Sequence, residues 1–96
     1  MIEIKLKKTV QTVAGTIKIY TWKGYEIKAY DFGGLPSVTA WSLFHEYGVR
    51  CSQTGVFLVS ESALMIPVTE SDRMLTELQD CAELAVYLEA HWEELI

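Results

Sequence analysis

The chain has no lysine after position 28, and this absence divides it into two parts of opposite charge. Residues 1–32 hold six lysines against three carboxylates, a net charge of +3, whereas residues 33–96 hold two arginines against ten carboxylates, a net charge of −8. A chain polarised in this way presents two different electrostatic surfaces, and the acidic one suits a basic partner.

Long apolar runs and a secretory leader are also lacking. No run approaches the roughly 18 residues of a membrane-spanning helix, and residues 1–8 alternate apolar and charged side chains, which is not the pattern of a signal peptide. The two cysteines, Cys51 and Cys81, are 30 positions apart and form no C-x-x-C pair. They predict reduced thiols in or near the core of a cytoplasmic protein. The lack of a long apolar run predicts that the protein has no membrane partner.

Motifs of catalysis and of metal or cofactor binding are missing as well. His45 and Glu46 lack the second histidine of H-E-x-x-H, because that position is Val49, and His91 stands alone. The chain has no G-x-S-x-G, no G-x-G-x-x-G and no P-loop. We therefore predict no catalytic residue, no metal, no cofactor and no enzymatic activity.

The residues that are present predict one compact domain over residues 1–96, because half of them are hydrophobic and the length suits a single core. Ile2, Ile4 and Leu6 alternate with charged residues, which is typical of a half-buried strand. Residues 16–21 and 25–32 predict a hairpin. A three-residue loop, Trp22 to Gly24, pairs Ile19 with Ile27 and gathers the apolar residues on one face, so we prefer it to a two-residue loop, which mixes the faces.

The second half predicts two helices. Ala40, Leu43, Phe44 and Tyr47 recur at helical spacing, which indicates a short helix from about Ser37 to Tyr47 that ends at Gly48. Residues 49–52, 56–60 and 64–68 are β-rich, and Pro67 favours an edge or strand end. A long amphipathic helix begins from an N-cap at Thr69. Its apolar stripe consists of Met74, Leu78, Cys81, Ala85, Leu88, Trp92 and Leu95, and Leu75, Ala82 and Val86 widen it.

Together these elements predict an α+β fold in the order β-β-β-α-β-β-α. An antiparallel sheet of about four to five strands packs against a short central helix and a long C-terminal amphipathic helix. The outer face of the last helix carries Asp80, Glu83, Tyr87 and Glu94. On the preferred hairpin register Trp22 lies at the loop tip, where it could equally anchor an interface or pack against the protein. Tyr25 is a second candidate for an exposed aromatic anchor. These six residues are the predicted partner-binding set.

The composition and this acidic face favour a small, acidic, non-enzymatic interaction protein. We expect it to bind and occlude a basic surface of a larger protein, including a nucleic-acid-binding one, because carboxylates at helical spacing imitate a row of phosphates. Immunity proteins, antitoxins and phage-encoded inhibitors of host defence share these gross properties. This is an analogy of class and not of residues.

Two alternatives remain open. The wide apolar arc of the last helix could pair with a copy of itself, which predicts a homo-oligomeric module such as a homodimer. Alternatively, lysines and tyrosines of the first strands share a sheet face that binds single-stranded nucleic acid, with the set Lys5, Lys7, Lys18, Lys28, Tyr20 and Tyr30. The net charge of −5 argues against direct binding of nucleic acid.

Overall fold

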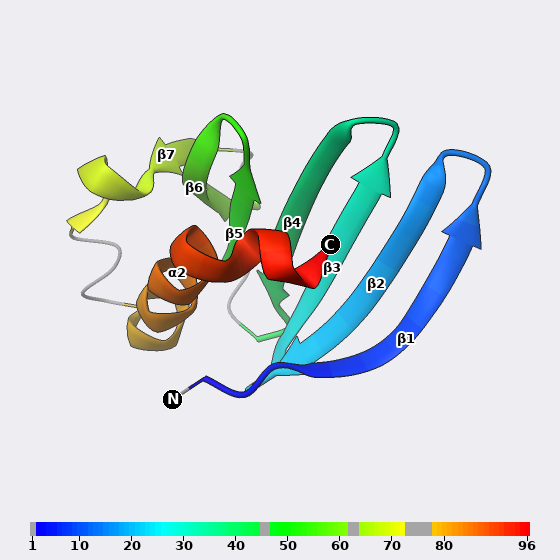
Figure 1. Ribbon diagram of the computed structural model, residues 1–96. Coiled ribbons are helices and arrows are strands. Elements are labelled where there is room, and N and C mark those ends of the chain that lie inside the picture. The colour runs from blue at the N-terminus through cyan, green and yellow to red at the C-terminus, as the bar shows by residue number, and fades with distance from the viewer. Residues whose placement is uncertain (1, 45–46, 62–63, 73–77) are drawn as a thin grey trace.

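In the computed structural model, seven strands form one antiparallel sheet and a C-terminal helix packs against one of its faces (Figure 1). The structure describes residues 2–44, 47–61, 64–72 and 78–96. The strands are β1 (Lys5–Thr12), β2 (Gly15–Trp22), β3 (Tyr25–Phe32), β4 (Leu35–Ser42), β5 (Tyr47–Ser52), β6 (Gly55–Ser60) and β7 (Met65–Pro67). The helical segments are η1 (Val68–Glu70), α2 (Gln79–His91) and η2 (Trp92–Leu95). Within these described ranges, no helix has the length and apolar character to cross a membrane.

Each strand pairs with its neighbour in the sequence, so the sheet order is β1 to β7 without a crossover. Tight turns join the neighbouring strands. Lys23 and Gly24 have φ angles of 38° and 78°, and Gly33 and Gly34 have φ angles of 51° and 86°. Two consecutive residues with positive φ are the signature of the type I′ turn, whose twist matches that of the strands it joins.

The predicted sheet of four to five strands with a central helix is wrong. The segment expected to be helical from Ser37 to Tyr47 contains most of β4, which pairs with β3 from Tyr25–Ser42 to Phe32–Leu35. The Gly33–Gly34 turn brings the two strands together. Hydrogen-bonded pairing on both sides of β4 outweighs the helical spacing of apolar residues, which only a few residues support. Positions 45 and 46 lie outside the described residues.

The predicted register of the first hairpin is also wrong. The loop has two residues, Lys23 and Gly24, so Trp22 pairs with Tyr25 and Ile19 pairs with Lys28. A slip of one residue moves a whole strand's side chains to the other face. Trp22, Tyr25 and Ile27 consequently face the helix.

This register brings Lys18 and Tyr20 to the helix side of the sheet, where each finds a backbone carbonyl. Lys18 Nζ donates to the oxygen of Ile96 at 2.6 Å, and the Tyr20 hydroxyl donates to the oxygen of Leu95 at 2.8 Å. The faces remain mixed, as the sequence indicated, but these hydrogen bonds satisfy the two polar groups and fasten η2 to β2.

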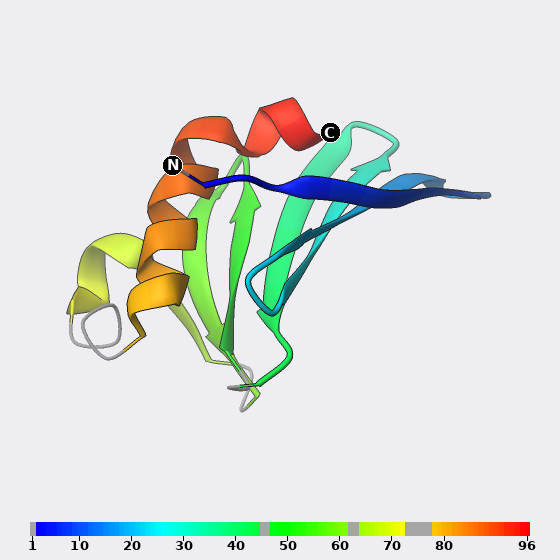
Figure 2. The same ribbon diagram turned by 90° about the horizontal axis from the view of Figure 1, so that it is seen from below.

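The core lies between the sheet and the α2–η2 segment, which packs on β4, β5 and β6 (Figure 2). Its largest fully buried side chains are Ile27, Leu58, Leu84, Leu88, Val38, Val49, Cys51 and Cys81. The prediction that both cysteines are buried, with free thiols, is confirmed.

The C-terminal helix is shorter than predicted. Thr69, the expected N-cap, lies inside η1, and α2 begins at Gln79. Positions 73–77, with Met74 and Leu75, lie outside the described residues. Of the predicted stripe, Cys81, Ala85, Leu88, Trp92 and Leu95 are buried. Val86 was assigned to this stripe wrongly, because it is 63% exposed, and the fully buried Leu84 was not included in it.

Both edges of the sheet carry features that oppose further strand pairing. Pro67 lies in β7, which confirms the prediction that it marks an edge, and proline offers no amide hydrogen to a further strand. At the other edge, the β1–β2 register shifts between Leu6 and Lys8. This bulge carries Lys7 and is flanked by Lys5 and Lys8, and bulges and lysines both blunt an edge.

Candidate functional site

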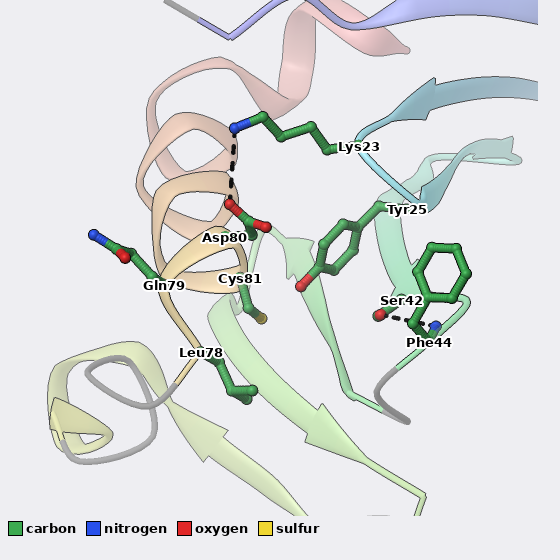
Figure 3. A pocket seen from close by; sticks show the side chains of 8 residues that line it. All are labelled: Lys23, Tyr25, Ser42, Phe44, Leu78, Gln79, Asp80 and Cys81. Carbon is green, nitrogen blue, oxygen red and sulfur yellow. Dashed lines mark hydrogen bonds and ion pairs between the residues drawn. The ribbon is translucent and has the colours of Figure 1, made fainter.

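A pocket of about 440 Å³ opens where the first turn of α2 meets the β2–β3 turn and the end of β4 (Figure 3). Its lining residues are Lys23, Tyr25, Ser42, Phe44, Leu78, Gln79, Asp80 and Cys81. Asp80 and Lys23 form an ion pair of 3.8 Å at its rim, and the Tyr25 hydroxyl points inward toward Cys81. The pocket is therefore lined by hydroxyl, thiol and apolar groups, with its charges at the mouth.

The chemistry of this pocket does not suit a nucleophile. Burial raises the pKa of Cys81, so its thiol stays protonated at neutral pH, and a thiol rather than a thiolate is a weak nucleophile. Burial also raises the pKa of Tyr25, and the neighbouring Cys81 raises it further. No histidine belongs to the described lining. The pocket can accept a side chain or a small polar molecule.

The structure separates the predicted partner-binding residues into two groups. Trp22 and Tyr25 are only 7% and 6% exposed and belong to the core, so the prediction that they are exposed anchors is wrong. The cause is the two-residue turn, which pairs the two rings at a centroid distance of 5.8 Å on the helix side of the sheet.

The other four residues lie on the helix layer. Asp80, Glu83 and Glu94 are exposed, whereas Tyr87 is half-buried and packs against His91 with ring centroids 4.8 Å apart. His91 Nδ1 also lies 3.2 Å from a carboxylate oxygen of Glu94. The structure thus places Asp80, Tyr87 and Glu94 along one side of α2 and η2, with Glu83 on the outermost row.

That outermost row contains a residue that sequence analysis missed. Glu83, Val86, Ala90 and Glu93 recur at spacings of three and four and are all exposed, so they form one line along the helix. We call the exposed carboxylates of this layer the acidic helix surface: Asp80, Glu83, Glu89, Glu93 and Glu94. Val86 lies at its centre with 63% of its surface exposed. The prediction placed Val86 on the apolar stripe, although its 200° displacement from the stripe residue Leu88 indicates the opposite side of the helix.

The opposite side of the sheet, which we call the open sheet face, carries a second surface that sequence analysis missed in this form. Directly paired residues form one continuous row across six strands: Lys8, Ile19, Lys28, Thr39, Arg50 and Phe57. Its three cations lie on alternate strands, β1, β3 and β5, and are therefore about 10 Å apart. The row could not be found without the register, because its members are far apart in the sequence.

Aromatic rings on the open sheet face lie against glycines. A Cβ atom on Gly48 would come within 2.6 Å of Trp41 Cε3, and one on Gly15 would come within 2.9 Å of Phe32 Cδ1. The Phe57 ring lies 3.6 Å from the corresponding point on Gly55. A ring over a strand glycine covers exposed backbone. It also keeps its other side toward solvent, as the 36% exposure of Trp41 shows.

The predicted lysine and tyrosine face does not exist as one surface. Lys18 and Tyr20 face the helix, whereas Lys28 and Tyr30 belong to the open sheet face. Among the residues that the structure describes, no group of histidine, cysteine, aspartate and glutamate is arranged to hold a metal ion.

Comparison of the chain with protein-family models, curated proteins and solved structures found no match. Functional inference for this chain rests on the geometry of its own residues. The two surfaces with the clearest physical character are the acidic helix surface and the open sheet face. They lie on opposite sides of the sheet, because α2 packs against one face and the open sheet face is the other (Figure 1).

Proposed function

We propose that the protein is a non-enzymatic interaction protein that binds and occludes a basic surface of a larger protein. The observation that carries this proposal is the acidic helix surface, where five exposed carboxylates share the helix layer with the exposed side chain of Val86. Charge complementarity steers a cationic partner toward such a surface and fixes its orientation.

The carboxylates of this surface are largely available to a partner. Within the described part of the chain, ion pairs of this surface involve Asp80 with Lys23 and Glu94 with His91. The side chains of the first pair are 60% and 57% exposed, and exposed ion pairs of this kind contribute little to stability. A partner's arginine or lysine can therefore replace Lys23 beside Asp80 at little energetic cost.

Val86 contributes apolar contact to the surface. At the centre of an interface such contact excludes water from the surrounding ion pairs. Glu83 and Glu89 lie three residues before and after Val86, so acids flank it along the helix axis. The pocket beside Asp80 adds a recess for a partner side chain. A basic groove of the kind that holds nucleic acid matches this arrangement, since the helix presents carboxylates where phosphates would lie.

Affinity capture from extracts of the source organism, at low and high salt, tests this proposal. The wild type should capture a protein with a basic surface, and raising the salt should weaken the complex. Glu83→Lys with Glu89→Lys should abolish capture. The matched control, Asp31→Lys with Glu70→Lys, changes the net charge equally at exposed positions off the helix and should capture normally.

Association and dissociation rates measured with the purified partner then separate electrostatic steering from apolar contact. Glu83→Lys should slow association, whereas Val86→Ala should mainly speed dissociation. Capture that survives both helix substitutions, or binding that salt does not affect, would contradict the proposed role of the acidic helix surface.

A further inference from the structure

The open sheet face has a positive local charge although the chain as a whole is acidic. The pairing register places four cations on it, Lys5, Lys8, Lys28 and Arg50, against one carboxylate, Glu26. Glu26 lies 3.5 Å from Lys28 Nζ, so the face retains a net charge of about +3. The uncovered side of the sheet therefore attracts anions.

The same face offers aromatic rings for stacking. Trp41 lies over Gly48, which is two residues along β5 from Arg50, so the ring and the cation are about 7 Å apart along the strand. Phe57 pairs directly with Arg50 on the next strand. Arg50 thus has an aromatic ring on each of the two neighbouring strands. Tyr30 and Phe32 form an edge-to-face pair nearby, with centroids 5.3 Å apart.

From this juxtaposition we infer that the open sheet face binds single-stranded nucleic acid, with phosphates on Lys28 and Arg50 and bases stacked on Trp41 and Phe57. Cationic side chains that follow the backbone and rings that receive bases are the two elements of sequence-tolerant single-strand binding. This site goes beyond the proposed function, because it lies on the other side of the sheet and uses none of the acidic helix surface.

The net charge of −5 does not oppose this site. The carboxylates of α2 lie across the sheet, at least one packing layer of about 10 Å away. Salt screens exposed charges over about 8 Å at physiological ionic strength. Affinity for phosphates is therefore set by the local charge of the open sheet face.

Other occupants fit the face less well. A symmetric dimer through this face would place the cation row of one copy against the same row of the other, and like charges repel. A nucleic-acid duplex keeps its bases stacked inside, so the rings of Trp41 and Phe57 would find no free base surface. In a single strand the phosphates bind the cations while the unpaired bases stack on the rings.

Fluorescence anisotropy with labelled 12-nucleotide oligothymidylate and oligouridylate tests the inference. With phosphates on all three cations of the row, Lys28, Arg50 and the flanking Lys8, the slope of log affinity against log salt should be about −2, a loss of about 20-fold between 50 and 200 mM salt. Lys28→Gln with Arg50→Gln should reduce the slope to about −0.7. Trp41→Leu should weaken binding about 5-fold or more and leave the slope unchanged.

Three controls keep the result specific. Lys7→Gln with Lys23→Gln removes two exposed lysines that lie outside the cation row, and this variant should keep the wild-type slope. Glu83→Lys with Glu89→Lys should bind the oligonucleotides at least as well as the wild type, so failure of the acidic-surface proposal is distinguishable from failure of this one. Circular dichroism establishes that Trp41→Leu is folded, and the lysine and arginine substitutions test the face independently.

Binding of either oligonucleotide with these slopes supports the inference. Absence of binding at 50 mM salt would overturn it, as would equal affinity for a duplex. Equal competition by polyglutamate of the same length would also overturn it, because that result would require charge alone and no stacking. If sedimentation shows a dimer that the substitutions Lys28→Gln with Arg50→Gln stabilise, the face is an interface between copies and the inference fails.

Discussion

Replacing Gly48 with alanine gives the sharpest test of how the open sheet face is built. A Cβ atom at this position would lie 2.4 Å from the backbone oxygen of Ala40 and 2.6 Å from Trp41 Cε3. Both distances are far inside van der Waals contact. The oxygen belongs to the paired strand β4, so it cannot move without disturbing the ladder between Trp41 and Gly48.

The size of the effect follows from two opposing contributions. Removing a glycine from the unfolded chain normally stabilises a protein by about 0.4–1 kcal/mol. Overpacking a close contact costs about 1–3 kcal/mol. We therefore expect Gly48→Ala to lower the free energy of unfolding by about 1–2 kcal/mol, or the melting temperature by about 5–15 °C for a domain of this size.

Thermal melting followed by circular dichroism measures this change. The double substitution Trp41→Leu with Gly48→Ala removes the ring but leaves the backbone oxygen, so it separates the two contacts in a double-mutant cycle. Gly34→Ala is a useful comparison, because its φ of 86° imposes backbone strain while no atom lies within 4 Å of the added carbon. A Gly48→Ala protein as stable as the wild type would refute the close packing of Trp41 over β5.

Three further outcomes follow from the core. Burial raises the pKa of the Cys51 thiol to about 12, with a smaller contribution from Glu89. The stabilisation that comes from keeping this thiol protonated is therefore complete below about pH 8.5, the ordinary pKa of cysteine, and is lost as the pH rises toward 12. Urea denaturation should accordingly give a falling midpoint from pH 8 to pH 10, and a flat midpoint would contradict this. In Ellman's assay at pH 8, Cys51 and Cys81 should react only after denaturant is added; prompt reaction of the native protein would show that the thiols are accessible. Tyr20→Phe removes the 2.8 Å hydrogen bond to the Leu95 oxygen and should lower the unfolding free energy by about 0.5–1.5 kcal/mol, measured by chemical denaturation, whereas no change would mean that water satisfies this carbonyl equally well.

Local sequence signals identified the strand-forming segments before Gly33 but not their register. The alternation of residues 25–32 predicts a strand, and β3 occupies that segment. The loop length between Trp22 and Tyr25 decides which side chains meet, and the sequence favoured segregated faces over the mixed faces that occur. Lys18 and Tyr20 are tolerated on the helix side because carbonyls of η2 accept their hydrogen bonds, and such distant partners leave no local signal.

The segment 35–47 shows the limit of periodicity as a guide. Apolar residues at Ala40, Leu43 and Phe44 match a helical spacing, yet Val38 and Ala40 alternate with Thr39 and Trp41 as in a strand. Gly33–Gly34 is itself a hairpin signal, and it forms the turn between β3 and β4. The acidic helix surface followed from composition and helical spacing, whereas the open sheet face required the pairing of six strands.

The order of the strands also shapes how the chain folds. Every ladder joins neighbours in the sequence, so the hairpins can form from β1 onward as the polypeptide emerges from the ribosome. The helix that covers the core is made after the strands, and the hydrogen bonds from Lys18 to Ile96 and from Tyr20 to Leu95 span 78 and 75 positions. Until α2 arrives, the nascent sheet exposes both of its faces. We expect the C-terminal segment to decide when this protein stops being prone to aggregation during synthesis.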